Sequence, residues 1–115
     1  AGIARVATDR TTAAHMAVYA AYESSNQKCV GGDKNAAGEP QSWGTWQLKY
    51  VPKEVACDPA RAASIWLALA HSAETTCKDS PPEDRLAPLA GGSCNRGRLV
   101  ARTRARIAKQ IVQSL

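Results

Sequence analysis

The sequence predicts a mainly α-helical fold in one domain covering residues 1–115, with a short irregular or β-hairpin insertion after the first long helix. Three observations lead to this prediction. A length of 115 residues suits a single compact domain. The hydrophobic fraction is 44% and rich in alanine, which favours helix because it loses no side-chain entropy there. Residues 24–41 are dominated by Ser, Asn, Gly, Asp and Pro, a composition typical of loops.

Capping signals and apolar spacing place the first helix and the segment after the insertion. Thr11 or Thr12 is expected to cap a helix that runs to Glu23, with Met16, Tyr19 and Tyr22 on one side. Residues 43–51 are apolar enough to be packed, and a proline at position 52 interrupts them.

The later helices have equally clear signals. Asp58-Pro59 predicts a helix start, because Asp is a good N-cap and Pro suits the first turn, and this helix should reach about Cys77. Residues 80–83 start a short helix, limited by Pro88 and two glycines. In the last helix an apolar stripe is expected to face the core while the arginines face water. Its members are four residues apart, with three further apolar residues alongside: Leu99, Thr103, Ile107, Ile111 and Leu115, and Val100, Ala108 and Val112.

The cysteines favour an oxidising compartment. Cys29, Cys57, Cys77 and Cys94 are far apart and form no CxxC pair of a zinc or redox motif, so we expect two disulfides of undetermined connectivity. The start of the chain shows no signal-peptide pattern, which predicts a mature form or another export route. No apolar run is long enough to span a membrane. The expected location is secreted or periplasmic, with association with a phage or a secretion system as an alternative.

Positive charge is concentrated near the C-terminus. Residues 85–115 hold seven basic side chains and no acidic one, whereas the rest of the chain has more acidic than basic residues. A basic flank attracts polyanions by long-range electrostatics, and an anionic cell wall is the expected partner. A nucleic-acid binder is the alternative, but no recognition motif accompanies the arginines, and we expect no nucleic-acid partner.

Glu23 is the main candidate for chemistry. It ends the first helix, where the negative end of the helix dipole disfavours an ionised carboxylate. Apolar walls formed by nearby tyrosines or tryptophans would disfavour it further. A carboxylic acid that keeps its proton near neutral pH can protonate the leaving oxygen of a glycosidic bond. A Glu at a helix end is more often simply a surface residue, so the position alone makes Glu23 only a candidate acid and the neighbouring residues must specify the chemistry.

The neighbours of Glu23 carry a family resemblance. Glu23-Ser24 is followed 24 residues later by Gln47 within Gly44-Thr45-Trp46-Gln47-Leu48. This pair resembles the Glu-Ser and Gly-Leu-Met-Gln-Ile motifs of soluble lytic transglycosylases and goose-type lysozymes, members of the lysozyme-like superfamily. Asp58-Pro59 is similar to the start of the family's next helix, and residues 86–98 are similar to its Leu-Ala-x-Tyr-Asn-Ala-Gly region. The resemblance covers roughly residues 12–110.

The resemblance implies a peptidoglycan-cleaving, bacteriolytic enzyme that degrades cell walls without a cofactor. Glu23 would be the acid and base, and Gln47 would contact the sugar from the opposite wall of the cleft. The further candidate substrate-binding residues are Ser24, Tyr22, Trp43 and Trp46. The two tryptophans could stack on the sugar, because aromatic planes suit pyranose faces. The family's Tyr-Asn pair has no clear counterpart, so the hydroxyl that steadies the glutamate in relatives is replaced or absent. Trp46 stands where relatives have Met.

A second carboxylate would decide the reaction. Lytic transglycosylases use one Glu and leave a 1,6-anhydromuramoyl end, the outcome favoured here because Glu23 alone has motif support. Two-carboxylate hydrolysis needs a partner about 5–9.5 Å away, and the candidates are Glu39 and Asp33. Glu39 is eight residues before Gln47, close to where goose-type lysozymes keep an acidic residue.

Other residue types give no competing site. His15 and His71 belong to helical stretches and are interpreted as structural or exposed, and no metal site is expected. Trp66 is expected in the core. A monomer is expected. The rival hypothesis from another class is a non-catalytic wall-binding protein on a lysozyme scaffold, and the missing Tyr-Asn pair is its main support.

Overall fold

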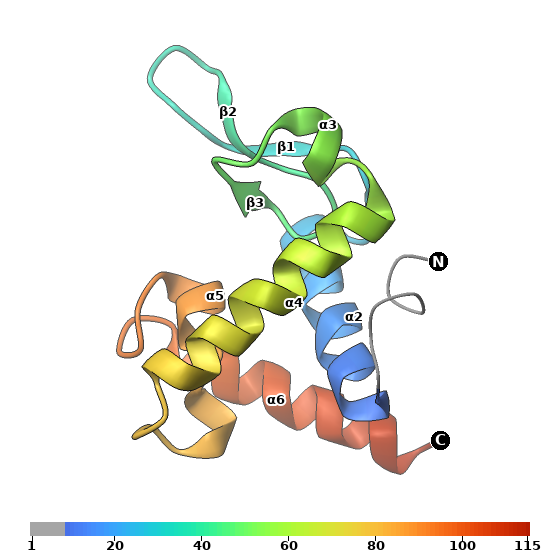
Figure 1. Ribbon diagram of the computed structural model, residues 1–115, viewed down its shortest axis with the longest axis vertical. Coiled ribbons are helices and arrows are strands. Elements are labelled where there is room, and N and C mark those ends of the chain that lie inside the picture. The colour runs from blue at the N-terminus through green and yellow to red at the C-terminus, as the bar shows by residue number, and fades with distance from the viewer. Residues whose placement is uncertain (1–8) are drawn as a thin grey trace.

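A long helix, a small sheet and a second group of helices follow one another along the chain (Figure 1). The computed structural model describes residues 9–115. It is 57% helix and 9% strand, with an antiparallel three-stranded sheet after the first described helix, which confirms the predicted fold class. The elements are α2 (Arg10–Ser24), β1 (Gly31–Lys34), β2 (Pro40–Trp43), β3 (Leu48–Lys49), α3 (Lys53–Ala56), α4 (Pro59–Thr76), a 3₁₀ turn η1 (Pro82–Asp84), α5 (Ala87–Gly91) and α6 (Arg98–Gln113). Residues 1–8, on which the expectation about a signal peptide falls, lie outside the described residues.

Helix α2 starts slightly earlier than its sequence predicts. Asp9 is the N-cap: its carboxylate accepts a hydrogen bond from the backbone N–H of Thr12 at 2.7 Å and another from the Thr12 hydroxyl at 3.0 Å. The expected Thr cap was therefore wrong, because an Asp side chain was available one turn earlier. The helix ends where Ser25 adopts a left-handed conformation, two residues after Glu23.

The predicted insertion is a sheet in the order β1-β2-β3. Strand β1 pairs antiparallel with β2, so that Gly32 faces Ser42, and β2 pairs with the short β3, so that Trp43 faces Leu48. The sheet lies beside the C-terminal end of α2, at the opposite end of the molecule from α6 (Figure 1). The expected hairpin is confirmed, with a third strand added.

The helix start predicted at Asp58 is confirmed, because the Asp58 carboxylate caps α4 by accepting from the backbone N–H groups of Ala60 and Arg61. Helix α4 ends at Thr76, close to the predicted end. The short helix expected after residue 80 is instead two pieces, η1 and α5. Pro88 lies in the first turn of α5 rather than ending a helix, as its fixed φ allows.

The main core lies where α2, the sheet and α4 meet. Its large members are Met16, Tyr19, Trp46 and Trp66, and most of the other buried positions are alanines. The rings of Tyr19 and Trp66 are 5.5 Å apart between centroids and tilted, an arrangement that aromatic pairs prefer. Alanine allows the helix backbones to approach these few large side chains closely.

The buried face of α6 differs from the predicted stripe. Ala101, Arg104 and Ala108 are buried, whereas Leu99 is 67% exposed and Leu115 74% exposed. Ala108 packs with Ala14 and Val18 of α2 in a second small core cluster. The predicted face is therefore confirmed at Ile107, Ala108 and Val112, which lie in or against this cluster, and wrong at Leu99 and Leu115. Close helix packing favours the small side chains of α6 over its large ones.

The arginines of α6 also depart from expectation, since three of them form ion pairs. Arg104 contacts Glu23 and is 8% exposed, Arg102 contacts the fully buried Asp84, and Arg106 contacts the exposed Glu83. The basic helix is therefore not simply a solvated charged face. Its charges partly neutralise acids of α2 and η1.

The Asp84–Arg102 pair predicts how stability depends on pH. Two bonds of 2.9 Å from the Arg102 guanidinium hold the pKa of the Asp84 carboxyl below its usual value. Because the folded pKa is lowered, the pair stabilises the fold fully above the unfolded value of about 3.9 and loses its effect as pH falls through the folded pKa. Asp84→Asn should thus lower the melting temperature at pH 7 by several degrees, and this difference should shrink as pH falls through the lowered pKa of Asp84.

Thermal unfolding followed by circular dichroism between pH 2 and pH 7 measures this difference. Glu83→Gln is the matched control, since Glu83 is adjacent and its ion pair with Arg106 is exposed. An exposed pair contributes little, so this variant should melt close to the unsubstituted protein. A melting-temperature gap for Asp84→Asn that stays constant down to pH 2 would contradict the assignment.

Two disulfides link segments that are distant in sequence. Cys29 is bonded to Cys57 and Cys77 to Cys94, as expected from four scattered cysteines. The first bond joins the segment before β1 to the end of α3, and the second joins the end of α4 to the loop after α5. Such bonds are compatible with an extracellular or periplasmic protein. Within the described residues, no helix has the length and apolar character that crossing a membrane requires.

Candidate functional site

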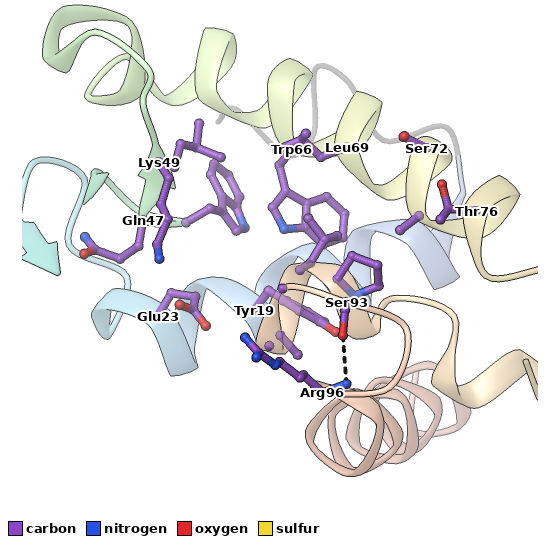
Figure 2. A pocket seen from close by; sticks show the side chains of 18 of the residues that line it. Tyr19, Glu23, Gln47, Lys49, Trp66, Leu69, Ser72, Thr76, Ser93 and Arg96 are labelled. Atoms are coloured by element: carbon purple, nitrogen blue, oxygen red, sulfur yellow. Dashed lines mark hydrogen bonds between the residues drawn. The ribbon is translucent and has the colours of Figure 1, made fainter. Parts of the chain in front are cut away.

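A cleft of about 1020 Å³ opens between the end of α2, the sheet, α4, α5 and the loop after α5 (Figure 2). Its floor is apolar, with Tyr19, Trp46 and Trp66 from the core, while its rim carries charged and hydroxyl side chains. Those rim residues are Glu23, Asp33, Gln47, Lys49, Ser72, Thr76, Ser93 and Arg96. The cleft therefore combines an apolar base with polar groups that can orient a ligand.

Glu23 lies on this cleft, near the C-terminal end of α2, in the same part of the cleft as Gln47 and Lys49 (Figure 2). Its side chain is 28% exposed. Arg104 Nη1 donates to Glu23 Oε2 at 2.9 Å, and among the described residues no side chain bonds Oε1. One carboxyl oxygen of Glu23 is thus held by α6, and the other is free to meet a ligand.

Arg104 reaches Glu23 from between two tyrosines. Its guanidinium carbon is 4.6 Å from the ring centroid of Tyr19 and 4.8 Å from that of Tyr22, both within cation–π range. Apolar walls were expected around Glu23, and this cation was not predicted. A guanidinium in contact with Glu23 makes the surroundings of this carboxyl group charged on one side, so they differ from the wholly apolar surroundings expected.

Tyr19 is a buried hydroxyl on the cleft that sequence reasoning assigned only to the apolar side of the helix. Burial raises the pKa of Tyr19 to about 12, with the nearby charge of Arg104 acting in the opposite direction. Its hydroxyl has no hydrogen-bond partner among the described residues. Tyr19 therefore stays neutral under physiological conditions and carries an unused donor.

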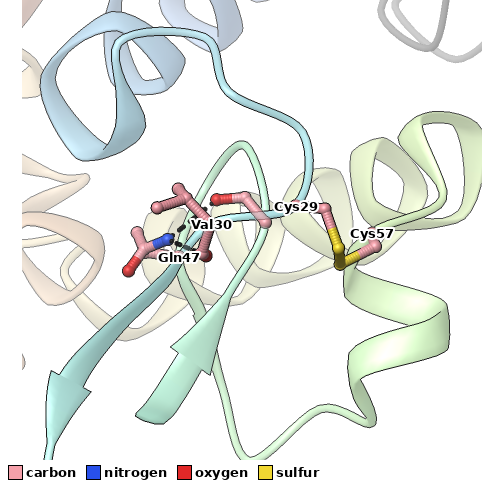
Figure 3. Close-up of a disulfide and its surroundings, with 5 residues drawn as sticks. Cys29, Val30, Gln47 and Cys57 are labelled. Atoms are coloured by element: carbon pink, nitrogen blue, oxygen red, sulfur yellow. Dashed lines mark hydrogen bonds between the residues drawn. A yellow bond between two sulfur atoms is a disulfide. The ribbon is translucent and has the colours of Figure 1, made fainter.

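Gln47 lies on the cleft as predicted, but its amide is largely occupied. Its Nε2 donates to Val30 O at 2.8 Å and to Gly44 O at 3.0 Å (Figure 3). Its Oε1 accepts from Ser42 Oγ at 3.1 Å. Both N–H groups thus bind the protein, and only acceptor capacity on Oε1 is left for a sugar.

The turn that carries Gln47 depends on two glycines. Gly44 has a φ of 86°, and a Cβ there would overlap Ala56 O. A Cβ on Gly32 would overlap the amide oxygen of Gln47. Gln47 itself has a φ of 50°, an uncommon conformation for a residue other than glycine. Such strain is often found at functional sites, and here the hydrogen bonds of the Gln47 side chain maintain it.

Three of the other predicted binding residues lie elsewhere. Ser24 Oγ donates to Thr45 O at 2.6 Å, which ties α2 to the Gln47 turn, and Ser24 does not line the cleft. Trp43 lies outside the cleft beside Lys53. Tyr22 is 56% exposed and lines a separate hollow of about 260 Å³ with residues of α6. These placements give Ser24 a positioning role and offer no sugar contact for Trp43 or Tyr22 in this cleft.

Trp46 lines the cleft, yet it belongs to the core. It is buried, and its indole N–H donates to Met16 O at 2.8 Å. Its ring forms part of the cleft floor with Trp66, which sequence reasoning had placed in the core alone. Only the small exposed part of the Trp46 ring is therefore available to contact a sugar.

Of the two candidate second carboxylates, only Asp33 lies on the cleft. Its carboxylate accepts from Ser42 Oγ at 3.3 Å and pairs with Lys49 Nζ at 3.4 Å. Glu39 is exposed in the β1–β2 connection and does not line the cleft, so its placement does not support the expected catalytic role. The β1–β2 connection closes in a tight turn from Asn35 to Gly38 and extends away from the helices (Figure 1), which places Glu39 off the cleft.

Sequence reasoning missed Arg104, Lys49 and Arg96. The one available signal for Arg104 was its position between Ala101 and Ala108, which marks a face of small residues. Among residues 9–115, no group of three or more His, Cys, Asp or Glu side chains is arranged to hold a metal ion. Comparisons with protein-family models, curated proteins and solved structures find no match to this chain.

Proposed function

We propose that this chain cleaves the β-1,4 bond between N-acetylmuramic acid and N-acetylglucosamine in peptidoglycan, with Glu23 as the acid. The observation that carries the proposal is the position of Glu23 at the end of α2, on a cleft that Gln47 also lines. The cleft volume of about 1020 Å³ lies at the top of the range of about 300–1,000 Å³ typical of small-molecule sites. A cleft of this size with hydroxyl and charged groups on its rim suits an extended glycan.

The contacts of Glu23 suggest how it works in the proposed reaction. Oε1 carries the proton and gives it to the glycosidic oxygen, while Arg104 holds Oε2. Once that proton has left, the carboxylate is stabilised by the same arginine. Glu23 then takes the proton of the muramic acid C6 hydroxyl as the oxygen attacks C1, which regenerates the acid. The reaction consumes no water, and the product carries a 1,6-anhydromuramoyl end.

Hydrolysis remains the second candidate, because Asp33 lies on the same cleft. Its carboxylate could activate a water or stabilise the oxocarbenium ion if it approached the substrate. Lys49 and Ser42 already bind Asp33, and these contacts favour a role in holding the sheet edge together. For this reason the one-carboxylate reaction is proposed as the main activity.

The products of purified peptidoglycan, separated and weighed by mass spectrometry, test the proposal. The expected muropeptides are lighter by one water than the reducing products of hydrolysis. Asp33→Asn should retain activity within about 10-fold, since a residue outside the chemistry costs less than the 100-fold typical of a lost general base. Reducing ends together with an inactive Asp33→Asn variant would instead assign lysozyme-type hydrolysis.

A non-catalytic wall-binding function is the alternative from another class, and the Glu23–Arg104 ion pair is the observation that favours it. Binding to insoluble peptidoglycan without any soluble product, at high protein concentration and over long incubation, would support that alternative. Under either function, the two disulfides fit a protein that is secreted or acts in the periplasm.

A further inference from the structure

The loop between α5 and α6 is fastened at several points. Gly92 ends α5 in a left-handed conformation, and Ser93 Oγ accepts from the Arg96 backbone N–H at 3.1 Å. Cys94 is bonded to Cys77 at the end of α4. Gly97 packs so closely on α5 that a Cβ there would overlap Ala87 O. The backbone that carries Arg96 is thus held from both sides rather than free.

Arg96 extends from this loop along the cleft, in the direction of Glu23 (Figure 2). Its side chain is exposed and forms no ion pair among the described residues. The other cation that lines the cleft, Lys49, is paired with Asp33. Among residues 9–115, Arg96 is therefore the cleft-lining cation left available to a ligand, in contrast to the paired arginines of α6.

The surroundings of Arg96 indicate the chemistry of that ligand. Ser93 lies beside Arg96 on the same loop, and the hydroxyl groups of Ser72 and Thr76 line the cleft from α4, opposite Arg96 (Figure 2). A guanidinium presents parallel N–H donors that match a carboxylate, and charge-assisted bonds of this kind are about twice as strong as neutral ones. An anionic group next to a sugar ring would meet both the cation and the hydroxyls.

We infer that Arg96 binds a carboxylate carried by the glycan and thereby makes the cleft selective for muramic-acid-containing strands over neutral ones. This inference rests on the proposed function. The carboxylate could belong to the lactyl group of a strand without peptides or to a stem peptide. Both sources present the same chemistry to the arginine, and they can be told apart by the choice of ligand.

Binding is measured in a Glu23→Gln background so that no ligand is cleaved. Three glycans of equal length serve as probes: a peptide-free strand with lactyl carboxylates, a strand with stem peptides, and a neutral oligomer of N-acetylglucosamine. At least one carboxylate-bearing strand should bind about 10-fold more tightly than the neutral oligomer, equal to about 1.4 kcal/mol. A preference limited to one of the two anionic strands identifies the source of the carboxylate.

Arg96→Gln should remove this preference and leave the affinity for the neutral oligomer unchanged. Arg98→Gln is the matched control, because Arg98 is two residues away, exposed, and outside the cleft lining. The three proteins compared all carry Glu23→Gln. Any effect of losing the Glu23–Arg104 ion pair is therefore the same in each and cancels in the comparison. Circular dichroism and melting temperature verify that both variants fold.

The outcomes separate the two proposals. If the Glu23→Gln protein binds all three glycans with equal affinity, the role of Arg96 is overturned while glycan binding stands. A preference that survives Arg96→Gln, or that Arg98→Gln reduces equally, overturns it as well. Failure to bind any of the three glycans overturns the proposed function and this inference together.

Discussion

Glu23→Gln is expected to reduce peptidoglycan cleavage by about 100- to 10,000-fold, the range that a general acid and base contributes. Glutamine keeps the size and hydrogen-bonding shape of the side chain but has no transferable proton. The loss should appear in kcat, because the glutamine side chain can still occupy the same place on the cleft. The release of soluble muropeptides from purified peptidoglycan, measured at several substrate concentrations, gives kcat and KM separately.

The matched control for this prediction is Glu39→Gln. Glu39 carries the same functional group but is exposed on the hairpin, away from the cleft lining. Its replacement should change the cleavage rate by less than about 3-fold, as expected for a surface substitution. Equal losses in the two variants would mean that net charge, not a proton donor, governs the activity, and wild-type-like turnover by Glu23→Gln would exclude Glu23 as the acid.

The fold was predictable where local signals and packing agree. Asp58 followed by Pro59 set the start of α4 because both residues satisfy the first turn of a helix without help from distant residues. The polar insertion was predictable in place and type, since glycine-rich polar segments do not continue a helix. Its third strand was not, because β3 is only two residues long and pairs through its backbone.

The surroundings of the site were less predictable, because they depend on contacts between residues far apart in sequence. Arg104 and Glu23 are 81 residues apart, and nothing local to either one indicates the other. Periodicity favoured a stripe that began at Leu99, whereas packing against α2 buries Ala108 and leaves Leu99 exposed. A helix can bury a face of small residues when a close approach gains more contacts than large exposed side chains would lose.

Single-residue motifs gave positions but not roles. Gln47 lines the cleft, yet its amide N–H groups are bonded to Val30 O and Gly44 O. Likewise, Ser24 is next to Glu23 in sequence and contributes a bond to Thr45 O instead of a substrate contact. A motif identifies residues that the turn requires. Their hydrogen-bond partners in the structure are needed to tell which of them build the turn and which of them face a ligand.

Arg104→Leu is expected to lower kcat for peptidoglycan cleavage by about 10- to 100-fold, with KM nearly unchanged because Arg104 does not line the cleft. The substitution removes the bond to Glu23 Oε2 and the packing between Tyr19 and Tyr22, so the carboxyl group is no longer held in one orientation. A misplaced catalytic group can cost about 100-fold. The free energy of unfolding should also fall by about 1–3 kcal/mol, less than for a fully buried pair because Glu23 is 28% exposed.

Arg104→Lys separates positioning from bulk stability. Because lysine keeps the positive charge, the Arg104→Lys variant should have a higher kcat than Arg104→Leu. Because lysine lacks the planar group that fits between two rings, its kcat should stay below that of the unsubstituted protein. Arg106→Gln, on the same helix and paired only with the exposed Glu83, is the matched control and should cleave and melt like the unsubstituted protein. All rates are compared well below the lowest melting temperature, so that every variant is folded during the assay.

Two outcomes for Arg104→Leu would contradict a positioning role. If the folded variant cleaves peptidoglycan at the unsubstituted rate, Arg104 only stabilises the junction of α2 and α6, and Glu23 acts without it. If KM rises while kcat is unchanged, Arg104 instead contributes to glycan binding, and the free Oε1 of Glu23 would need no partner to be oriented.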